Sequence, residues 1–191
     1  APTSNSSGAF SYASSNTAVA TISGSTVTII GAGTATITAT QAADGAYSSG
    51  TTTATLTVAT ASQGTLTVSA SATSIVSLTG TSTLSTSGGS GTGAVTYSST
   101  GGCTISGSTL TAGSTVGICT VTATKAADAN YAVTTATVNI SVTGTAPTIG
   151  SFSAINKTYG DANFTLTAPT SNSLSAFSYA SSNTAVATIS G

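Results

Sequence analysis

The chain carries few side chains that could do chemistry. Among its 191 residues only five are formally charged, and none is a histidine. The charged residues are Lys125, Lys157, Asp44, Asp128 and Asp161. Serine and threonine hydroxyls are abundant, but a hydroxyl nucleophile needs a neighbouring base, and histidine is the usual one. The sequence therefore predicts that the protein is not an enzyme and that it uses no cofactor.

The aspartates are typical of turn caps rather than of a metal site. Asp44 and Asp128 follow the same pair of alanines in two copies of a repeat, and aspartate in a turn accepts hydrogen bonds from nearby backbone N–H groups. A calcium site at a junction between repeats is the alternative, but calcium needs several oxygen ligands and usually more than one carboxylate. We expect turn caps and no metal ligands.

The two lysines could in principle form Lys–Asn isopeptide crosslinks. That chemistry normally needs a buried acid beside the reacting pair. Gln41 stands in place of Lys125 in the other copy of the repeat, so the crosslink would not be general to the repeat. We expect both Lys125 and Lys157 to be solvated.

The two cysteines give the clearest site prediction. Cys103 and Cys119 align with Ala20 and Ala35 of the other copy, so both positions change together. Positions that change as a pair are expected to touch, and we predict a buried disulfide whose loop of about 15 residues contributes about 3 kcal/mol. Two separate core thiols are the alternative, and a metal site would need further ligands. A disulfide predicts an extracytoplasmic location.

An internal repeat shows which elements position these residues. Residues 168–191 match residues 1–24 except at two positions, where Leu174 and Ser175 replace Ser7 and Gly8. A shorter period relates ATISGSTVT, from residue 20, to CTISGSTLT, from residue 103. It also relates ITATQAADGAY, from residue 37, to VTATKAADANY, from residue 121. The shorter period, roughly 80 residues, is the size of a small β-sandwich.

The repeat predicts three domains. Residues 1–61 form a domain that lacks its first strand or strands, and residues 62–143 form a complete domain with the disulfide. Residues 144–191 form a linker and the opening part of the next domain. We expect the chain to be a window on a longer polypeptide. The alternative is a discrete subunit whose tail completes a neighbour's first domain, although the two duplicated segments would then compete for one position.

Short alternating segments predict an all-β fold of tandem antiparallel sandwiches with about seven strands each. In residues 34–40 the side chains of Ala35, Ile37 and Ala39 share one face, and threonines take the other. Cys119, Val121 and Ala123 alternate in the same way in the second copy. Period-two patterning places one face inward and one in water. The segments 41–44 and 125–128 could form a short helical turn between the last two strands.

The composition argues against two classes of binding partner, nucleic acids and membranes. The net charge is −1, so no basic patch is available to hold nucleic acid. No apolar run approaches the roughly 18 residues of a membrane span. We expect neither nucleic-acid binding nor membrane insertion by this segment.

The pattern FSYASSNTAVATISGSTVTIIGAGTATITATQAADGAY, from residue 10, resembles bacterial immunoglobulin-like domains of large surface proteins. The opening INKTYGDANFTLTA, from residue 155, is similar to the YGD start of related tandem domains (the BIg and MBG-YDG types). The resemblance implies immunoglobulin-like sandwiches in an array and gives no catalytic residues. Such modules serve as stalks, adhesins, filaments or sheath components.

Two functions follow as expectations. The first is a structural repeat of an extracellular bacterial surface filament, stalk or sheath, whose partners are neighbouring copies bound end to end and possibly side by side. The second is an adhesin module that binds a glycan or a surface protein through loops at the ends of the sandwich. Sugar binding would call for exposed aromatic rings, and only Tyr47, Tyr131 and Tyr159 are candidates.

Overall fold

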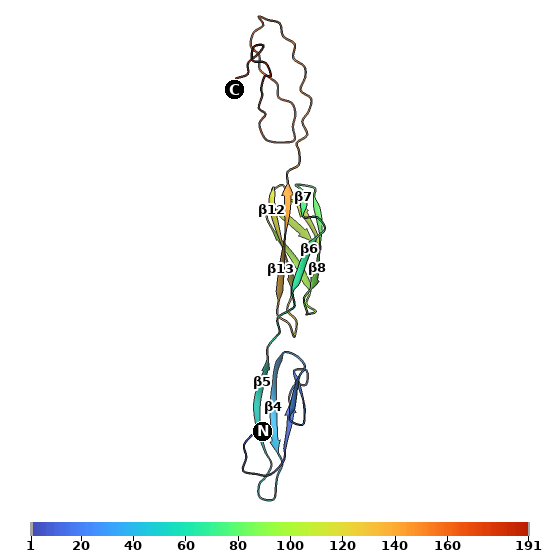
Figure 1. Ribbon diagram of the computed structural model, residues 1–191, viewed down its shortest axis with the longest axis vertical. Coiled ribbons are helices and arrows are strands. Elements are labelled where there is room, and N and C mark those ends of the chain that lie inside the picture. Colours follow the sequence, from blue (N-terminus) through green and yellow to red (C-terminus); the bar gives the residue numbers. More distant parts are fainter. Residues whose placement is uncertain (1, 191) are drawn as a thin grey trace. The chain divides into compact units, whose positions relative to one another are not determined.

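The computed structural model describes residues 2–190, which form thirteen strands and no helix (Figure 1). The chain divides into two compact units, Ala1–Thr143 and Gly144–Gly191. All thirteen strands lie in the first unit, five before residue 60 and eight after residue 65. The all-β fold class that alternation predicts is confirmed. The described residues contain no helix that is long and apolar enough to cross a membrane.

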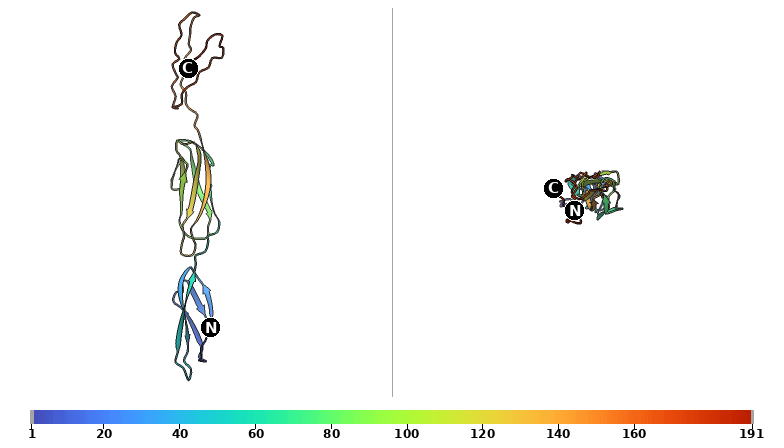
Figure 2. Two further views of the ribbon diagram at one scale, coloured as in Figure 1. Left: turned by 90° about the vertical axis from the view of Figure 1, so that its left-hand side faces the viewer. Right: turned by 90° about the horizontal axis from the view of Figure 1, so that it is seen from above.

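The later eight strands form a closed two-layer sandwich (Figure 2). One sheet has the order β10-β11-β8-β6 and the other β7-β13-β12-β9, and only the β7–β13 pair is parallel. One cluster of buried side chains joins both sheets, with Leu84 and Leu110 from the first and Val121 and Ile140 from the second. The strands are β6 (Leu66–Ala70), β7 (Ser74–Val76), β8 (Thr81–Gly88), β9 (Val95–Thr100), β10 (Cys103–Ser106), β11 (Thr109–Ala112), β12 (Gly117–Lys125) and β13 (Thr134–Thr143).

The first five strands repeat only part of that sandwich. The sheet β1-β4-β5 corresponds to β9-β12-β13, and the hairpin β2-β3 corresponds to β10-β11. Within residues 2–61 no strand takes the places of β6, β7 and β8. The strands are β1 (Phe10–Ser14), β2 (Ala20–Ser23), β3 (Thr26–Ile29), β4 (Gly33–Gln41) and β5 (Gly50–Val58).

The predicted strand faces are correct. Ala35 and Ala39 on β4 are buried, and Cys119, Val121 and Ala123 on β12 are completely buried. The hairpins turn at glycines, since Gly24 and Gly107 have φ values of 60° and 58°, a region that strongly favours glycine.

The prediction of a helical turn after β4 and β12 is wrong. Residues 42–49 and 126–133 are irregular loops, and Asp44 and Asp128 hold them through hydrogen bonds to backbone N–H groups. A carboxylate that binds the N–H groups two and three residues ahead satisfies them without a helix.

Described residues 144–190 contain no strand and only an isolated bridge between Ile149 and Ser171. Residues 168–190 nevertheless share almost all of their sequence with residues 1–23, which contain β1 and β2. In the first copy β1 pairs with β4 and β2 pairs with β3, and both partners come from residues 26–41. The described residues after 168 include no counterpart of that segment, so the strand-like sequence finds no partner among them.

Candidate functional site

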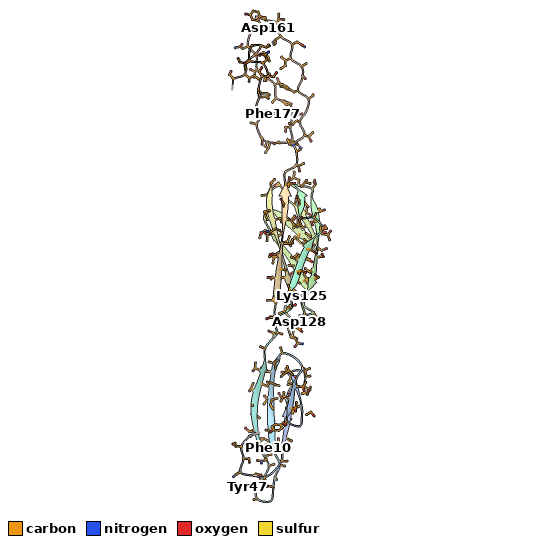
Figure 3. All side chains as sticks on the ribbon, viewed as in Figure 1. Phe10, Tyr47, Lys125, Asp128, Asp161 and Phe177 are labelled. Carbon is orange, nitrogen blue, oxygen red and sulfur yellow. A yellow bond between two sulfur atoms is a disulfide. The ribbon has the colours of Figure 1, made fainter. Side chains whose placement is uncertain are left out.

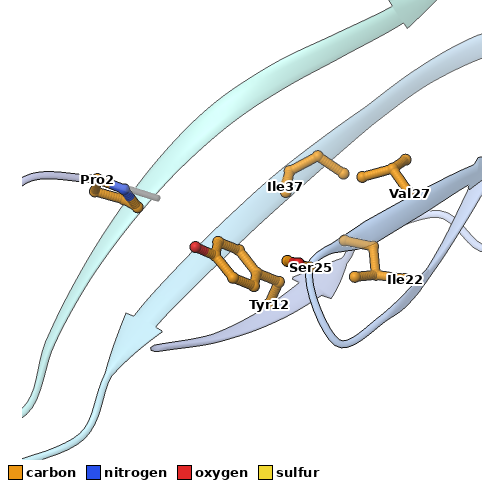
Figure 4. A pocket seen from close by; sticks show the side chains of 6 residues that line it. All are labelled: Pro2, Tyr12, Ile22, Ser25, Val27 and Ile37. Carbon is orange, nitrogen blue, oxygen red and sulfur yellow. The ribbon is translucent and has the colours of Figure 1, made fainter. Parts of the chain in front are cut away.

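The first sandwich has an inner face that no described strand covers. It begins with the hairpin sequence ATISGSTVTII, whose alternation should turn Val27 and Ile29 toward a core. Instead 43% of Val27 and 52% of Ile29 are exposed. Figure 4 shows a pocket in which Ile22 and Val27 of the hairpin face Tyr12 and Ile37 of the sheet. We call the pocket and the outer edge of β3 the open face.

The second sandwich shows the same positions covered. Leu110 and Ala112 correspond to Val27 and Ile29, and both are buried. Strand β8 pairs with β11, placing Ser82 opposite Leu110. Leu84 of β8 joins the buried cluster around Leu110. The exposure of Val27 therefore comes from the missing covering strands and not from its own hairpin.

Sequence reasoning predicted the missing strands but not this apolar surface. The signal was present: Val27, Ile29 and Ile30 lie on or beside β3, and the described residues ahead of β1 correspond only to residues 87–94, so none of them matches β6, β7 or the first part of β8. An aliphatic strand without covering strands must expose its apolar side chains.

Cys103 and Cys119 form a disulfide, with their Cα atoms 6.2 Å apart. The bond joins β10 of one sheet to β12 of the other, and Cys119 is completely buried. Ala20 and Ala35, the corresponding residues, lie together in the buried cluster of the first sandwich. The crosslink thus takes the place of a small apolar contact between the two sheets.

Asp44 and Asp128 are both turn caps. Each carboxylate accepts backbone hydrogen bonds from the residues two and three ahead, at 2.8–3.0 Å. The other oxygen reaches back to the loop before β1 or β9: Asp44 binds Ser6 and Ser7, and Asp128 binds the N–H and hydroxyl of Thr92.

These hydrogen bonds favour the charged carboxylates. The hydroxyl of Ser6, helped by backbone N–H groups, holds the pKa of Asp44 far below its usual value. The backbone N–H of Thr92 is the main cause that lowers the pKa of Asp128 to about 2. Each aspartate, charged at neutral pH, thus ties one loop to the loop beside it. No group of three or more potential metal-ligating side chains occurs in the described part of the chain.

The two lysines make weak contacts. Lys125 Nζ donates to the carbonyl oxygen of Gly88 at 3.5 Å, and Lys157 Nζ lies 5.0 Å from the centre of the Phe164 ring. Figure 3 shows Lys125 and Asp128 near the same end of the second sandwich. Lys157 is exposed to solvent, whereas Lys125 is only partly exposed.

The linker between the two sandwiches is held by hydrogen bonds. The N–H of Ala61 donates to the carbonyl oxygen of Asn130, and the N–H of Ala132 donates to the carbonyl oxygen of Ala61, both at 2.8 Å. The side-chain oxygen of Asn130 also accepts a hydrogen bond from the N–H of Ala32 at 2.8 Å. One turn of the second sandwich therefore binds both the linker and a loop of the first.

Comparison with known proteins gives one family match. Residues 3–43 match the model of the immunoglobulin-like domain of intimin. No curated protein sequence matches significantly. The matched residues stop before the second copy and do not include the YGD segment at residues 159–161.

Two of the solved structures that match this chain do so over most of its length. The crystal structure of the S-layer protein rSbsC(31-844) is 22% identical, with a TM-score of 0.29, over 73% of this chain and 21% of that one. The crystal structure of domains 4 and 5 of the S-layer protein SbsC is 24% identical, with a TM-score of 0.26, over 72% and 70%. The chain thus spans about a fifth of the first structure. By its own strands and by the match over residues 3–43, this is an all-β protein of immunoglobulin-like β-sandwich domains, similar in its first domain to the immunoglobulin-like domain of intimin.

Proposed function

We propose that the chain is a structural repeat of an extracellular bacterial surface filament, stalk or sheath, built from immunoglobulin-like domains of the tandem YGD type. The carrying observation is the junction between the two sandwiches. A linker that only connected independent modules would need no hydrogen bonds to either module. Here both the N–H and the carbonyl oxygen of Ala61 form hydrogen bonds with the turn around Asn130. A junction held in this way limits bending between successive domains.

Composition supports a location outside the cell. A disulfide persists in oxidising compartments, and the intimin immunoglobulin-like domain is a module of a bacterial surface protein. Two lysines and no arginine leave few sites for trypsin-like proteases. These features favour an exposed structural protein over a catalyst.

The scarcity of charge favours contacts between copies. A net charge of −1 over 191 residues gives little electrostatic repulsion between neighbouring chains. The strands present threonine and serine to solvent, so lateral contacts would use hydroxyl faces and sheet edges rather than ion pairs. The proposed partners are therefore other copies of this chain, end to end and side by side.

Electron microscopy of the purified chain, and of the native material that contains it, tests the proposal. We expect ordered filaments or sheets with an axial repeat of one or two domains. Isolated flexible strings that bind a glycan or a surface protein only at their tips would contradict it and favour an adhesin. Hydrolytic activity of the pure chain would contradict both.

A further inference from the structure

One side chain of the second sandwich reaches the first sandwich directly. In the turn after β12, the side-chain oxygen of Asn130 accepts a hydrogen bond at 2.8 Å from the N–H of Ala32, which lies between β3 and β4. The backbone of Asn130 is held separately, because its N–H donates to Asp128 and its carbonyl oxygen accepts from Ala61. The side chain of Asn130 is therefore fixed at its base, and we call its hydrogen bond to Ala32 the junction latch.

The first sandwich leaves room for Asn130 at Gly31. A Cβ atom added at Gly31 would lie 2.9 Å from the side-chain oxygen of Asn130 and 2.9 Å from the carbonyl oxygen of Ala18. Both distances are too short for a carbon–oxygen contact, so a larger residue would displace either the loop or Asn130. The φ of Gly31 lies outside the left-handed region, so the close approach of these two oxygens is what favours glycine here.

Each half of the latch occurs in only one of the two sandwiches, which we call the first type (residues 1–61) and the second type (residues 62–143). Ala46 takes the place of Asn130 in the first type. Its N–H makes the same hydrogen bond to an aspartate, at 3.0 Å, but its methyl group cannot accept one. Residues 30–32 join β3 to β4, whereas the longer loop 113–116 joins β11 to β12 in the second type. The donor loop thus belongs to the first type and the acceptor to the second.

The linker by itself does not fix the first sandwich. The hydrogen bonds of Ala61 join the linker to the second sandwich, and only residues 59 and 60 separate Ala61 from the end of β5. Each of these two residues has two soft backbone dihedrals, so the segment allows bending. The latch lies outside this segment and attaches the loop between β3 and β4 to the second sandwich. A second attachment beside a hinge prevents rotation about it.

We infer that the latch makes a first-type sandwich and the second-type sandwich after it one stiff pair, and that this pair is the repeating unit of the proposed filament. Residues 168–190 repeat residues 1–23 at all but two positions, so the first type recurs after the second. A turn like that around Ala46 offers no side-chain acceptor, so a junction in which the first type follows the second lacks the latch. The inference rests on the proposed function, because it names the unit from which the filament is built.

Residual dipolar couplings of the 191-residue chain, measured by NMR in a dilute alignment medium, test the stiff pair. Sandwiches that move as one body share a single alignment tensor, and sandwiches that move independently do not. We expect one tensor for the wild-type chain and its loss in Asn130→Ala, which has no acceptor. The Ala32 amide should also exchange about three- to tenfold faster, because it loses a hydrogen bond. Separate tensors in the wild-type chain, or a common tensor that survives Asn130→Ala, would overturn the inference.

The first sandwich supplies a matched control and a second variant. Asn130→Ala should keep the turn folded, because Ala46 makes the same backbone hydrogen bond in the first type. Ala46→Asn places an asparagine at the opposite end of β4 from Ala32 and should leave the common tensor unchanged. Gly31→Ala breaks the latch from the side of the first sandwich and should remove the common tensor as well. In every variant the couplings within each sandwich should still fit one tensor, which shows that both sandwiches remain folded.

Electron microscopy keeps this test separate from the wider proposal. In filaments of the native material we expect bends at alternate junctions. Filaments that bend equally at every junction would leave the structural role standing and exclude the pair as the unit. A common tensor that depends on Asn130, in a protein whose native material forms no filaments, would support the stiff pair and count against the filament.

Discussion

Val27 and Leu110 occupy the same position in two copies of the same hairpin, yet 43% of Val27 is exposed and Leu110 is completely buried. The hairpins have the same register, with Val27 opposite Ile22 and Leu110 opposite Ile105. The difference lies in the neighbouring strand: β8 covers β11, and no described strand covers the outer edge of β3. The difference between the exposed fractions of Val27 and Leu110 therefore shows how far a covering strand buries this position.

Truncation should reveal this difference directly. Leu110→Ala should lower the free energy of unfolding of the second sandwich by about 2–5 kcal/mol, because it leaves a cavity in a packed core. Val27→Ala should change that of the first sandwich by less than about 1 kcal/mol, because its side chain is already half in water. Urea denaturation of both variants gives the comparison. Similar losses in the two would mean that the first sandwich is covered in solution.

The disulfide can be replaced by the residues of the first copy. Changing Cys103→Ala together with Cys119→Ala should keep the fold, since Ala20 and Ala35 pack in the same places. The unfolding free energy should fall by about 3 kcal/mol, because the unfolded chain regains the freedom of the closed loop. Calorimetry measures this, with reduced wild-type protein as the control. An unchanged melting temperature on reduction would contradict the assignment.

Acid should weaken the sandwiches through the two turn caps. The pKa of Asp128 is about 2 in the folded state, against about 3.9 for a free aspartate. A lowered folded pKa means that the stabilisation is complete above about pH 4 and is lost as the pH falls toward 2. The loss attributable to Asp44 continues to lower pH, since hydrogen bonds from Ser6 and its neighbours lower its pKa further. The melting temperature should therefore stay nearly constant from pH 6 to about pH 4 and fall as the pH is lowered from 4 to 2.

Substitutions separate the contributions of the individual aspartates to the pH dependence of the melting temperature. Asp128→Asn should lower the melting temperature of the second sandwich at pH 7 and flatten its dependence on pH. Asp161→Asn is the matched control, because Asp161 lies in the other compact unit and contacts Thr158. A full acid dependence that survives both Asp44→Asn and Asp128→Asn would exclude the turn caps as its cause.

Limited proteolysis should distinguish the two lysines. Trypsin should cut the native chain after Lys157, which is exposed and outside any strand, and should spare Lys125 in β12. Cleavage requires local opening, and a strand paired on both sides opens far less often than an irregular segment. Mass spectrometry at low protein concentration should find a product ending at Lys157. Lys157→Gln should abolish this cut, and early cutting at Lys125 would contradict the assigned strand.

Much of the first sandwich and of the disulfide could be predicted from residue patterns. Alternation in β4 and β12 fixes which side chains face inward, because successive side chains of a strand point to opposite faces. Pairing of Cys103 with Cys119 followed from comparing two copies of one repeat. The turn caps also followed, since Asp44 and Asp128 act through residues two and three positions ahead.

The helical turn was the local prediction that failed. Two alanines before an aspartate suit a helix, but Asp128 also binds Thr92, which lies far earlier in the chain. Contacts with the loop before β9 therefore override the local preference of residues 125–128. Propensity over so short a segment is weaker than a set of hydrogen bonds to a carboxylate.

By itself the sequence determined what is local or repeated: strand faces, glycine turns, the cysteine pair and the repeat. Only the tertiary structure decided which apolar side chains are covered. Residues 2–23 and 169–190 are nearly identical, but only the first set forms strands, and Val27 is exposed where Leu110 is buried. The reason is that a strand completes its hydrogen bonds and buries its inner face only against partners that come from elsewhere in the chain.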